Sequence, residues 1–422
     1  MEKCVSASSS PYPSPPPPPP EIKHVVDSAE STPKEGFFSS LIQSHTNFDS
    51  LWKNSISVDA LSCSMARLCF TATPPSIPPN CSTALCCHCS AQFLQHHTSS
   101  TLQDVKAQFI SVAQMPRQQL GKPEVMEKIF SQLKDHICDL MMDQHCDLSI
   151  LVIFQASTVH QMTRILHLVI QNQHKLKEVC MHNHGSLVFQ KLLEHLKTPD
   201  QISAAVFAVK RICVRLSKNI NGGHVIHHCL KLFSPALTTF IIDEVAENCV
   251  EIATDKSGCS TLQKCLHHAK DNTMKRLIQE IVSHASLLTE HPFGNYAVQY
   301  VAKMKIPSVN AEIMLQLQGR YAQLSTNKHA SNVVEHLLEF SEEKDAANII
   351  QELMYTQNFL RIIQDPYGNY VVQRALQNCK GSVYKMLSTI ILLNYPYLHT
   401  HPYGKRVLTF VQRRKNYEQR HI

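Results

Sequence analysis

The sequence predicts an all-α protein in which a repeat of about 36 residues builds an α-solenoid behind a proline-rich N-terminal segment. Three observations support this fold class. A short turn motif recurs eight times in register, and an apolar stripe with helical spacing follows each turn. The 422-residue chain also contains only 11 Gly, which argues against glycine-rich phosphate loops and against a β-rich fold with many tight turns.

The N-terminal segment differs from the remainder in composition. Residues 1–100 hold 13 of the 22 Pro, including an unbroken run from Pro15 to Pro20. They carry a net charge of −2, against +8 for residues 101–422. Proline runs favour solvated polyproline II and do not build a packed core. We therefore predict a mostly disordered leader over residues 1–104 and a folded domain over 105–422.

Cysteine and histidine cluster near the end of this leader. The cluster comprises Cys81, Cys86, Cys87, His88 and Cys89. A zinc site needs four converging ligands, usually as two pairs, and no clear second pair is present nearby. A cysteine-rich stretch without metal is the favoured interpretation, so we expect no metal and no cofactor, and the role of the leader stays open.

The repeat is defined by a small residue at a turn, and we call the residue that follows it position one. Eight such positions lie 36 to 39 residues apart. They are Asp147, Ser186, Gly223, Cys259, Asn295, Ser331, Asn369 and Lys405. The small residue before position one is Gly in six units, so more than half of the glycines in the chain occupy one slot of one repeat.

A capping residue stands three places before each small residue. These residues are Asp143, His182, Asn219, Asp255, His291, Asn327, Asp365 and His401. Asp and Asn are preferred helix N-caps, and Pro292, Pro366 and Pro402 follow where a first helical residue would stand. The pattern predicts a capped turn that begins a helix near each position one.

Position eight is apolar in seven of the eight units, which gives each predicted helix a buried stripe. A second apolar-periodic segment precedes each turn, for example Met274–Leu288 and Asn348–Ile363. We therefore expect two helices per unit, stacked on their neighbours into one continuous core. A further repeat is expected near residues 105–122, where no turn motif is legible, so it is predicted to be degenerate.

Two near-copies of the turn carry a resemblance to a known family. The strings His291-Pro-Phe-Gly-Asn-Tyr-Ala-Val-Gln299 and Asp365-Pro-Tyr-Gly-Asn-Tyr-Val-Val-Gln373, with the closing His401-Pro-Tyr-Gly-Lys-Arg406, resemble the Pumilio (PUF) family of RNA-binding proteins. The resemblance implies a right-handed α-solenoid of Pumilio-type repeats. Asn369 then belongs to the eighth repeat, Asp147 to the second, and Lys405 to a C-terminal capping half-repeat.

The resemblance also implies one RNA base per repeat, read by positions one and five, with position two stacking on the bases. The implied base-edge residues are Asn369, Gln373, Ser331, Glu335, Asn295, Gln299, Cys259, Gln263, Ser186 and Gln190. The implied stacking residues are Tyr370, Asn332, Tyr296 and His224. Paired amides suit uracil, and a carboxylate suits the two adjacent donors of guanine. With RNA antiparallel to the repeats, the expected site is 5′-UGUANA.

Other chemistry finds little support in the sequence. No zinc-protease, P-loop or nucleophile-elbow motif is present, so we do not expect an enzyme. His227-His228 and His267-His268 lack an acidic partner at metal-ligand spacing. No segment reaches the roughly 18 apolar residues that a membrane span needs, and no secretion signal is visible. The 16 Cys are therefore expected to be reduced thiols inside the cell.

Taken with the resemblance, these features predict a cytoplasmic, monomeric protein that binds single-stranded RNA in messenger 3′ untranslated regions. It would regulate translation or message stability through repressor or deadenylation-type protein partners, without binding DNA or membranes. A different class stays open: a degenerate helical scaffold for proteins that has lost specific RNA binding. Leu148, Leu187 and Ser260 at position two favour this alternative, because the family usually has an aromatic residue, His or Arg there.

Overall fold

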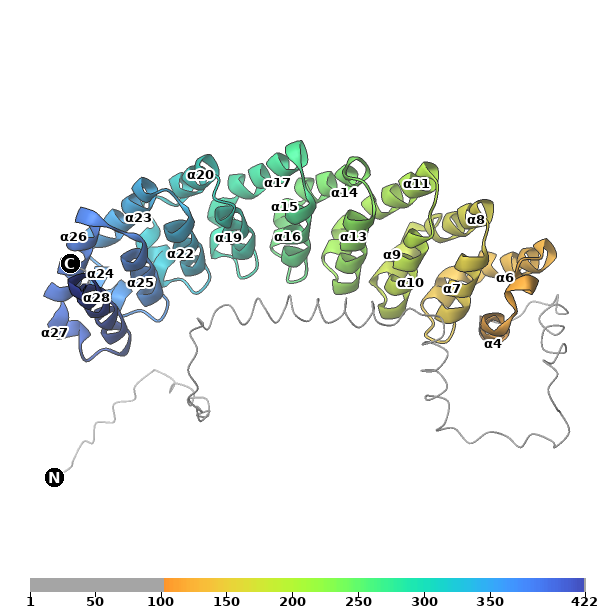
Figure 1. The fold of residues 1–422 in the computed structure, drawn as a ribbon, viewed down its shortest axis with the longest axis horizontal. Coiled ribbons are helices and arrows are strands. Elements are labelled where there is room, and N and C mark those ends of the chain that lie inside the picture. Colours follow the sequence, from red (N-terminus) through yellow and green to blue (C-terminus); the bar gives the residue numbers. More distant parts are fainter. Residues whose placement is uncertain (1–101, 421–422) are drawn as a thin grey trace, which may run out of the picture. The chain divides into compact units, whose positions relative to one another are not determined.

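The computed structural model describes residues 102–420, and over that range its regular structure is helical, with no strand. The helices form a curved row of repeats (Figure 1). One layer of helices lines the convex, upper side of the row, and the helices that follow the turn motif line the opposite side. This confirms the predicted all-α solenoid. Within the described range no helix combines the length and apolarity needed to cross a membrane.

Within residues 102–420, seven repeats contain an outer helix, a short middle helix and a motif helix, whereas the N-terminal unit passes directly from α6 (Pro123–Met141) to its motif helix. The outer helices are α8 (Val159–Ile170), α11 (Pro199–Lys210), α14 (Pro235–Glu247), α17 (Asp271–Ser283), α20 (Pro307–Leu317), α23 (Glu343–Tyr355) and α26 (Gly381–Leu393). The middle helices are α9 (Gln173–Met181), α12 (Cys213–Ser217), α15 (Cys249–Ala253), α18 (Ala285–Glu290), α21 (Tyr321–Thr326), α24 (Phe359–Ile363) and α27 (Tyr395–Leu398). The motif helices are α7 (Asp147–Ala156), α10 (Asn183–Glu194), α13 (Ile220–Leu232), α16 (Gly258–His268), α19 (Asn295–Lys303), α22 (Ala330–Phe340), α25 (Gly368–Asn378) and α28 (Pro402–Arg420).

The expectation of two helices per repeat was wrong for these seven repeats, because the segment before the turn breaks into an outer and a middle helix. Three junctions share one device: a polar side chain donates to the carbonyl four residues earlier and closes the outer helix. Asn248 Nδ2 lies 2.9 Å from Glu244 O, and Asn394 Nδ2 lies 2.8 Å from Ile390 O. His284 Nδ1 lies 2.9 Å from Glu280 O. These bonds satisfy carbonyls that the helix end would otherwise leave open.

The slot before position one is small because it touches the preceding middle helix. A Cβ atom on Gly258 would lie 2.2 Å from the carbonyl oxygen of Ile252, and one on Gly222 would lie 2.5 Å from that of Leu216. The same clash, with the carbonyl six residues earlier, recurs at Gly185 and Gly368. Close backbone approach, and not a positive φ, therefore explains why glycine marks the turn.

Neighbouring repeats share a single apolar core. The position-eight residues Phe154, Leu193, Leu230, Leu266, Ala302, Leu338 and Leu376 are all buried, which confirms the predicted stripe. Gln412, the polar exception in the capping unit, is exposed. Because each motif helix packs against the motif helices before and after it, no repeat completes its core alone.

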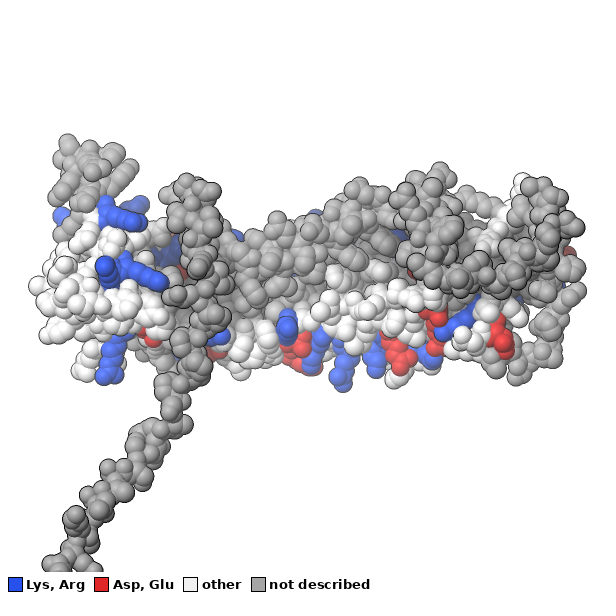
Figure 2. Space-filling model, turned by 90° about the horizontal axis from the view of Figure 1, so that it is seen from below, with Lys and Arg blue, Asp and Glu red and all other residues white. Residues whose placement is uncertain are grey.

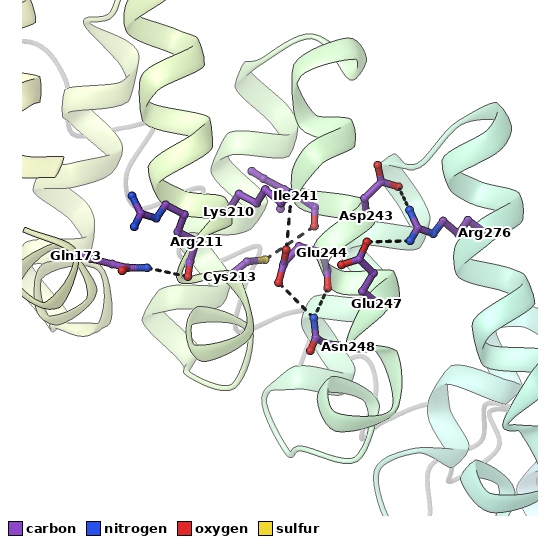
Figure 3. Close-up of polar contacts among 10 residues, drawn as sticks. All are labelled: Gln173, Lys210, Arg211, Cys213, Ile241, Asp243, Glu244, Glu247, Asn248 and Arg276. Carbon is purple, nitrogen blue, oxygen red and sulfur yellow. Dashed lines mark hydrogen bonds and ion pairs between the residues drawn. The ribbon is translucent and has the colours of Figure 1, made fainter. Parts of the chain in front are cut away.

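Ion pairs and hydrogen bonds join successive repeats on the outer layer (Figure 3). Arg276 of α17 reaches back to α14, where its two terminal nitrogens lie 3.0 Å from Asp243 Oδ1 and 3.0 Å from Glu247 Oε1. Between other repeats, Lys218 pairs with Glu251 at 2.9 Å. Exposed pairs of this kind contribute at most about 1 kcal/mol each, so they orient neighbouring repeats more than they stabilise them.

The N-terminal end of the array is closed by short helical elements. They are α4 (Leu102–Ile110), the 3₁₀ turn η2 (Ser111–Gln114) and α5 (Arg117–Leu120), followed by α6 (Pro123–Met141). Phe109 and Leu120 are fully buried against the repeat of α7. The expected first repeat is therefore reduced to a cap that covers the core. The predicted leader over residues 1–104 lies, except for its last three residues, outside the described range.

Candidate nucleic-acid interface

The eight predicted capping residues all accept backbone N–H groups of the turn that follows. Asp365 Oδ1 accepts from the amides of Tyr367 at 2.7 Å and Gly368 at 2.8 Å. His291 does the same with a ring nitrogen, since its Nδ1 lies 3.1 Å from the Gly294 amide. Equivalent bonds to a side-chain acceptor occur at Asp143, His182, Asn219, Asp255, Asn327 and His401. The capped-turn prediction is confirmed, and each capped turn fixes the backbone just before position one.

In the repeat of α19, the position-one amide is tied back to this turn. Asn295 Nδ2 lies 2.8 Å from the carbonyl oxygen of His291 and 2.9 Å from that of Pro292. Since both partners are acceptors, this nitrogen must be the donor, and Asn295 Oδ1 points to Gln299. Gln299 Nε2 donates to that oxygen at 2.6 Å. One N–H and the carbonyl oxygen of the Gln299 amide remain to meet a ligand.

The repeat of α25 reproduces this arrangement. Asn369 Nδ2 donates to the carbonyl oxygens of Asp365 at 2.8 Å and Pro366 at 3.0 Å. Gln373 Nε2 donates to Asn369 Oδ1 at 3.1 Å and also to the Asn369 carbonyl oxygen at 3.2 Å, a second bond that Gln299 does not make. Asn295 and Asn369 are both buried, whereas Gln299 and Gln373 are half-buried. The position-five side chain is therefore the outer member of each pair, and the position-one side chain orients it.

The repeat of α22 lies between these two and carries a different pair. Ser331 is buried, and its Oγ has no hydrogen-bond partner among the residues that the structure describes. Glu335 stands at position five, one turn further along the same helix face. A carboxylate here accepts hydrogen bonds and cannot donate them while ionised. This repeat therefore has hydrogen-bonding requirements opposite to those of a donor-bearing amide.

Two further repeats pair a small position-one side chain with Gln. Cys259 Sγ lies 3.4 Å from the Lys256 carbonyl oxygen, and Ser186 Oγ lies 3.2 Å from that of Asn183, so both side chains also donate back to the turn. Burial raises the pKa of the Cys259 thiol to about 11, which keeps it protonated at neutral pH. Gln190 Nε2 bonds the Ser186 backbone oxygen at 3.1 Å. Gln263 occupies position five of the Cys259 repeat and is half-buried.

The repeat of α13 has no position-one side chain, and the structure gives a reason. A Cβ atom on Gly223 would lie 2.7 Å from Thr261 Oγ1, which belongs to the next repeat. Thr261 is buried, and its hydroxyl lies 3.3 Å from the Ser217 carbonyl oxygen. At position five, the ring of His227 meets that of His268 edge-on, with centroids 5.4 Å apart. No amide or carboxylate pair can form here.

Position-two side chains stand beside these pairs. Tyr370 is 37% exposed, and Arg406 Nη1 donates to its hydroxyl oxygen at 3.3 Å. Tyr296 and His224 are half-buried. Asn332 bonds the turn instead, with Nδ2 at 3.1 Å from the His329 carbonyl oxygen. Arg406 was not among the predicted stacking residues, although the repeat register places it at position two of the capping unit.

The second repeat lacks the amide pair altogether. Leu151 occupies its position five, and Asp147 occupies position one. Asp147 Oδ1 accepts from the adjacent Leu148 amide at 2.6 Å. Burial of the Asp147 carboxyl raises its pKa, because the charged form loses hydration there. This end of the motif-helix face has no group equivalent to Gln299.

Metal and thiol chemistry are weakly supported at this face. The nine cysteines in the described range are buried and unpaired to one another, and burial raises the pKa of each thiol, for example Cys249 to about 12. A thiol kept protonated is a poor nucleophile and metal ligand. No group of three or more His, Cys, Asp or Glu side chains within residues 102–420 is arranged to hold a metal ion. The predicted cluster at Cys81–Cys89 lies outside these residues.

The side of the array that carries the motif helices bears both charge signs. Blue and red side chains alternate along one border, and several blue side chains project at the C-terminal end (Figure 2). Lys405 and Arg406, at positions one and two of the capping unit, are exposed. Charge along that border is therefore mixed, and specific pairs matter more there than a uniform basic surface.

Comparisons with known proteins agree with this architecture. A family model described as "Pumilio-family RNA binding repeat" matches residues 175–205, 213–246, 248–282, 320–354 and 358–391. The chain is 38% identical over 290 residues to Pumilio homolog 12 of Arabidopsis thaliana, which covers 69% of this chain and 49% of that protein. It thus spans about half the length of the curated relatives it matches.

Solved structures match the folded part of the chain. One is the Puf4 RNA-binding domain bound to an HO endonuclease RNA 3′ UTR recognition sequence, with a TM-score of 0.61 and 28% identity over 75% of this chain and 100% of that one. A double mutant of Puf4 bound to a Cox17 RNA 3′ UTR recognition sequence matches with a TM-score of 0.58 and 30% identity, covering 68% and 97% of the two chains. These matches confirm the predicted right-handed solenoid.

Proposed function

This chain belongs to the Pumilio family of RNA-binding repeat proteins, which are not enzymes, and we propose that it reads single-stranded RNA of the form 5′-UGUANA. The observation that carries the proposal is the pair of oriented amides, Asn295 with Gln299 and Asn369 with Gln373, on either side of Ser331 and Glu335. Of these three adjacent repeats, two present an Asn–Gln pair with a donor and an acceptor, and the one between them presents a carboxylate that only accepts hydrogen bonds.

The oriented amide is complementary to uracil. With Gln299 Nε2 bonded to Asn295, its second N–H and its carbonyl oxygen form one donor and one acceptor side by side. Uracil presents an N3–H donor beside a carbonyl acceptor on its pairing edge, so both of its groups are satisfied. Gln373 would offer the same edge in the eighth repeat once its Nε2 exchanges the bond to the Asn369 carbonyl oxygen for one to the base. These two repeats would read the first and third bases of 5′-UGU.

The carboxylate of Glu335 is complementary to guanine. Guanine alone presents two adjacent donors, N1–H and N2–H₂, on its pairing edge, and an ionised carboxylate accepts both. Uracil and adenine would each place an acceptor against the carboxylate, which leaves buried polar groups unsatisfied. The seventh repeat would therefore read the second base as G.

The remaining repeats would add weaker selection. Cys259 with Gln263 and Ser186 with Gln190 resemble adenine-reading pairs of the family, which places A at the fourth and sixth bases. Gly223 offers no side chain, so the fifth base is unselected. With the second repeat lacking an amide, we expect 5′-UGU to dominate the specificity. Each missing base contact costs on the order of 1–3 kcal/mol.

In the cell, the targets would be 3′ untranslated regions of messenger RNA, because the RNAs bound to Puf4 in the matched structures are 3′ UTR recognition sequences. We propose a cytoplasmic, monomeric regulator of translation or message stability that acts through repressor or deadenylation-type protein partners. A single chain would suffice for binding, since all the proposed reader pairs lie on one array.

A second candidate is a protein-interaction scaffold without specific RNA binding. The observation that favours it is the apolar N-terminal part of the motif-helix face, where Leu148, Leu187 and Leu151 replace groups that stack on or bond to bases. The intact central and C-terminal repeats argue against it, because a scaffold has no need for two identically oriented Asn–Gln pairs.

Binding to two short RNAs distinguishes these functions. The full chain should bind an RNA containing 5′-UGUAUA at least tenfold more tightly than one containing 5′-UCUAUA. Equal or absent binding would overturn the proposed function. A sharper version combines Ser331→Asn with Glu335→Gln, since the Asn327 and Lys328 carbonyls stand where the Asn295 amide finds its acceptors. That double variant should change the preferred second base from G to U.

A further inference from the structure

A line of exposed side chains runs beside the proposed base readers. Successive residues of an α-helix are about 100° apart, so positions one, five and nine lie along one gradually turning line. Position nine is exposed in all eight motif helices, whereas position one is buried or half-buried in most of them. The eight residues are Gln155, Glu194, Lys231, His267, Lys303, Glu339, Gln377 and Arg413. Position nine therefore marks the centre of the solvent-facing side.

Charge along this line is concentrated over three consecutive repeats. Lys231, His267 and Lys303 occupy position nine of α13, α16 and α19, and Lys264 occupies position six of α16. We call these four residues the basic strip. Neither position six nor position nine of these three helices holds an acidic residue. The strip is therefore a local run of one sign on a face that is otherwise mixed.

Each acidic residue that flanks the basic strip is paired with a lysine or arginine side chain outside the strip. Glu194, at position nine of α10, bonds Lys191 Nζ at 2.8 Å. Glu339, at position nine of α22, lies 3.3 Å from Arg374 Nη1 of the next repeat. Both carboxylates thus have a cation beside them, which reduces their repulsion of a passing anion. The strip therefore ends on either side at a glutamate of position nine, and each of these glutamates is already paired with a cation.

The geometry relates the basic strip to the RNA backbone. Position nine lies one helical turn, about 6 Å, beyond position five. A nucleotide whose base meets position five must carry its phosphate to one side of that base. Because each repeat takes one nucleotide, the phosphates would follow the array at the spacing of the motif helices.

We propose that the basic strip binds the phosphates of the nucleotides that follow 5′-UG, and so supplies affinity that does not depend on which base is read. This rests on the proposed function, in which α19, α16 and α13 take the third, fourth and fifth bases. The helix α13 has no position-one side chain, and Thr261 leaves no room for one. The nucleotide there is held through its backbone, and the affinity gained is independent of its base.

Salt dependence tests the proposal. The variant Lys231→Gln, Lys264→Gln, Lys303→Gln should bind 5′-UGUAUA roughly tenfold to a hundredfold more weakly at 0.1 M salt. Its slope of log K against log salt should be smaller by about 2, since single strands give about 0.7 per phosphate contact. The preference for UGU over UCU should stay unchanged. If this variant kept the wild-type slope of log K against log salt, the proposed contact between the basic strip and the phosphates would be overturned.

A matched control removes three lysines from the outer layer. Lys275, Lys344 and Lys385 are exposed on α17, α23 and α26. Their triple change to Gln alters the net charge by the same amount, and should leave the slope within about 0.5 of the wild-type value because no phosphate contact is lost. An equal loss in both triple variants would mean that only net charge matters, and would also overturn the proposal. Matching thermal unfolding curves check that each variant folds.

Neutral linkages in the RNA locate the contact. Methylphosphonates that replace the phosphates after the third and fourth bases should weaken wild-type binding, but should cost the lysine-strip variant little more. If methylphosphonates weakened binding by the triple lysine variant as much as they weaken wild-type binding, the contact between the basic strip and these phosphates would be contradicted. If the wild type failed to separate UGU from UCU, the proposed function itself would fail, and that outcome is distinct from an unchanged slope in a chain that does discriminate.

Discussion

Gln299 Nε2 donates to Asn295 Oδ1 at 2.6 Å, one turn apart on the motif helix α19. Asn295 is itself held by two carbonyls of the preceding turn. This series of hydrogen bonds, from the turn to Asn295 and from Asn295 to Gln299, fixes which side of the Gln299 amide is the acceptor. A base that offers a donor where uracil has N3–H is accepted, and cytosine, with an acceptor at that place, is refused.

This relationship predicts the result of shortening position one. In Asn295→Ser, the Gln299 amide loses its fixed partner and can turn over. Preference for U over C and A at the third base should fall by about 1–3 kcal/mol. Competition binding with RNAs that vary only at that base measures it. Selectivity at the first base is the internal control, because Asn369 and Gln373 are untouched, and an intact preference at the third base would contradict the orienting role.

Stacking predicts a loss that does not depend on the base. Tyr370→Ala should weaken binding by about 1–3 kcal/mol for every RNA, since each base has an aromatic face. Tyr370→Phe should retain most of the affinity, because only the bond from Arg406 is lost. Fluorescence anisotropy with two RNAs of different sequence suffices. Tyr355→Ala, an exposed tyrosine on the outer helix α23, is the matched control and should bind as the wild type does.

The turn glycines differ in how much room they leave, which predicts an order of stabilities. A Cβ on Gly258 would meet the Ile252 carbonyl at 2.2 Å, whereas one on Gly294 meets the Leu288 carbonyl at 3.1 Å and a flexible side-chain carbon at 2.9 Å. Gly258→Ala should therefore lower the free energy of unfolding by about 1–3 kcal/mol, and Gly294→Ala by less. Urea denaturation measures both. Both glycines occupy the same slot of the repeat, at the start of a motif helix, so the reverse order would contradict the contact as the cause.

Burial of His336 predicts a pH dependence of stability. Burial lowers the pKa of this imidazole, and this effect outweighs the bond to the Asn332 carbonyl and the nearby Glu339 and Glu335, while Arg374 acts in the same direction as burial. A lowered pKa means that the unfolded chain takes up the proton first. Stability is then full above pH 6.5 and falls as the pH drops below it. The depressed pKa values of His268 and His329, caused first by burial, add to the effect.

The measurement compares urea unfolding between pH 8 and pH 5. His336→Phe should flatten the dependence, because the apolar ring fits beside Phe340 and does not titrate. A wild-type dependence in His336→Phe would show that this ring is not a source of the effect.

Much of this structure followed from local sequence signals. The caps at Asp365 and His291 and the glycine slot recur every 36 to 39 residues, so the register alone located every motif helix. The break between outer and middle helices was missed, because Asn248 and His284 carry no proline or glycine beside them. Their spacing of 36 residues is a signal that could have found it. The sequence placed Asn295 and Gln299 on one helix face, but the bonds from Asn295 to the turn carbonyls depend on backbone geometry that the pattern does not specify.

The contact between Gly223 and Thr261 could not be predicted, because it joins residues 38 apart through the stacking of two repeats. It has a consequence for redesign. A one-base-per-repeat array invites reprogramming by exchange of positions one and five, but the repeat of α13 would refuse a new position-one side chain while Thr261 remains. The smallest editable module there spans two repeats, and Gly223→Ser would have to be introduced together with Thr261→Ala. The base that a repeat of this array can read therefore depends partly on residues of the neighbouring repeat.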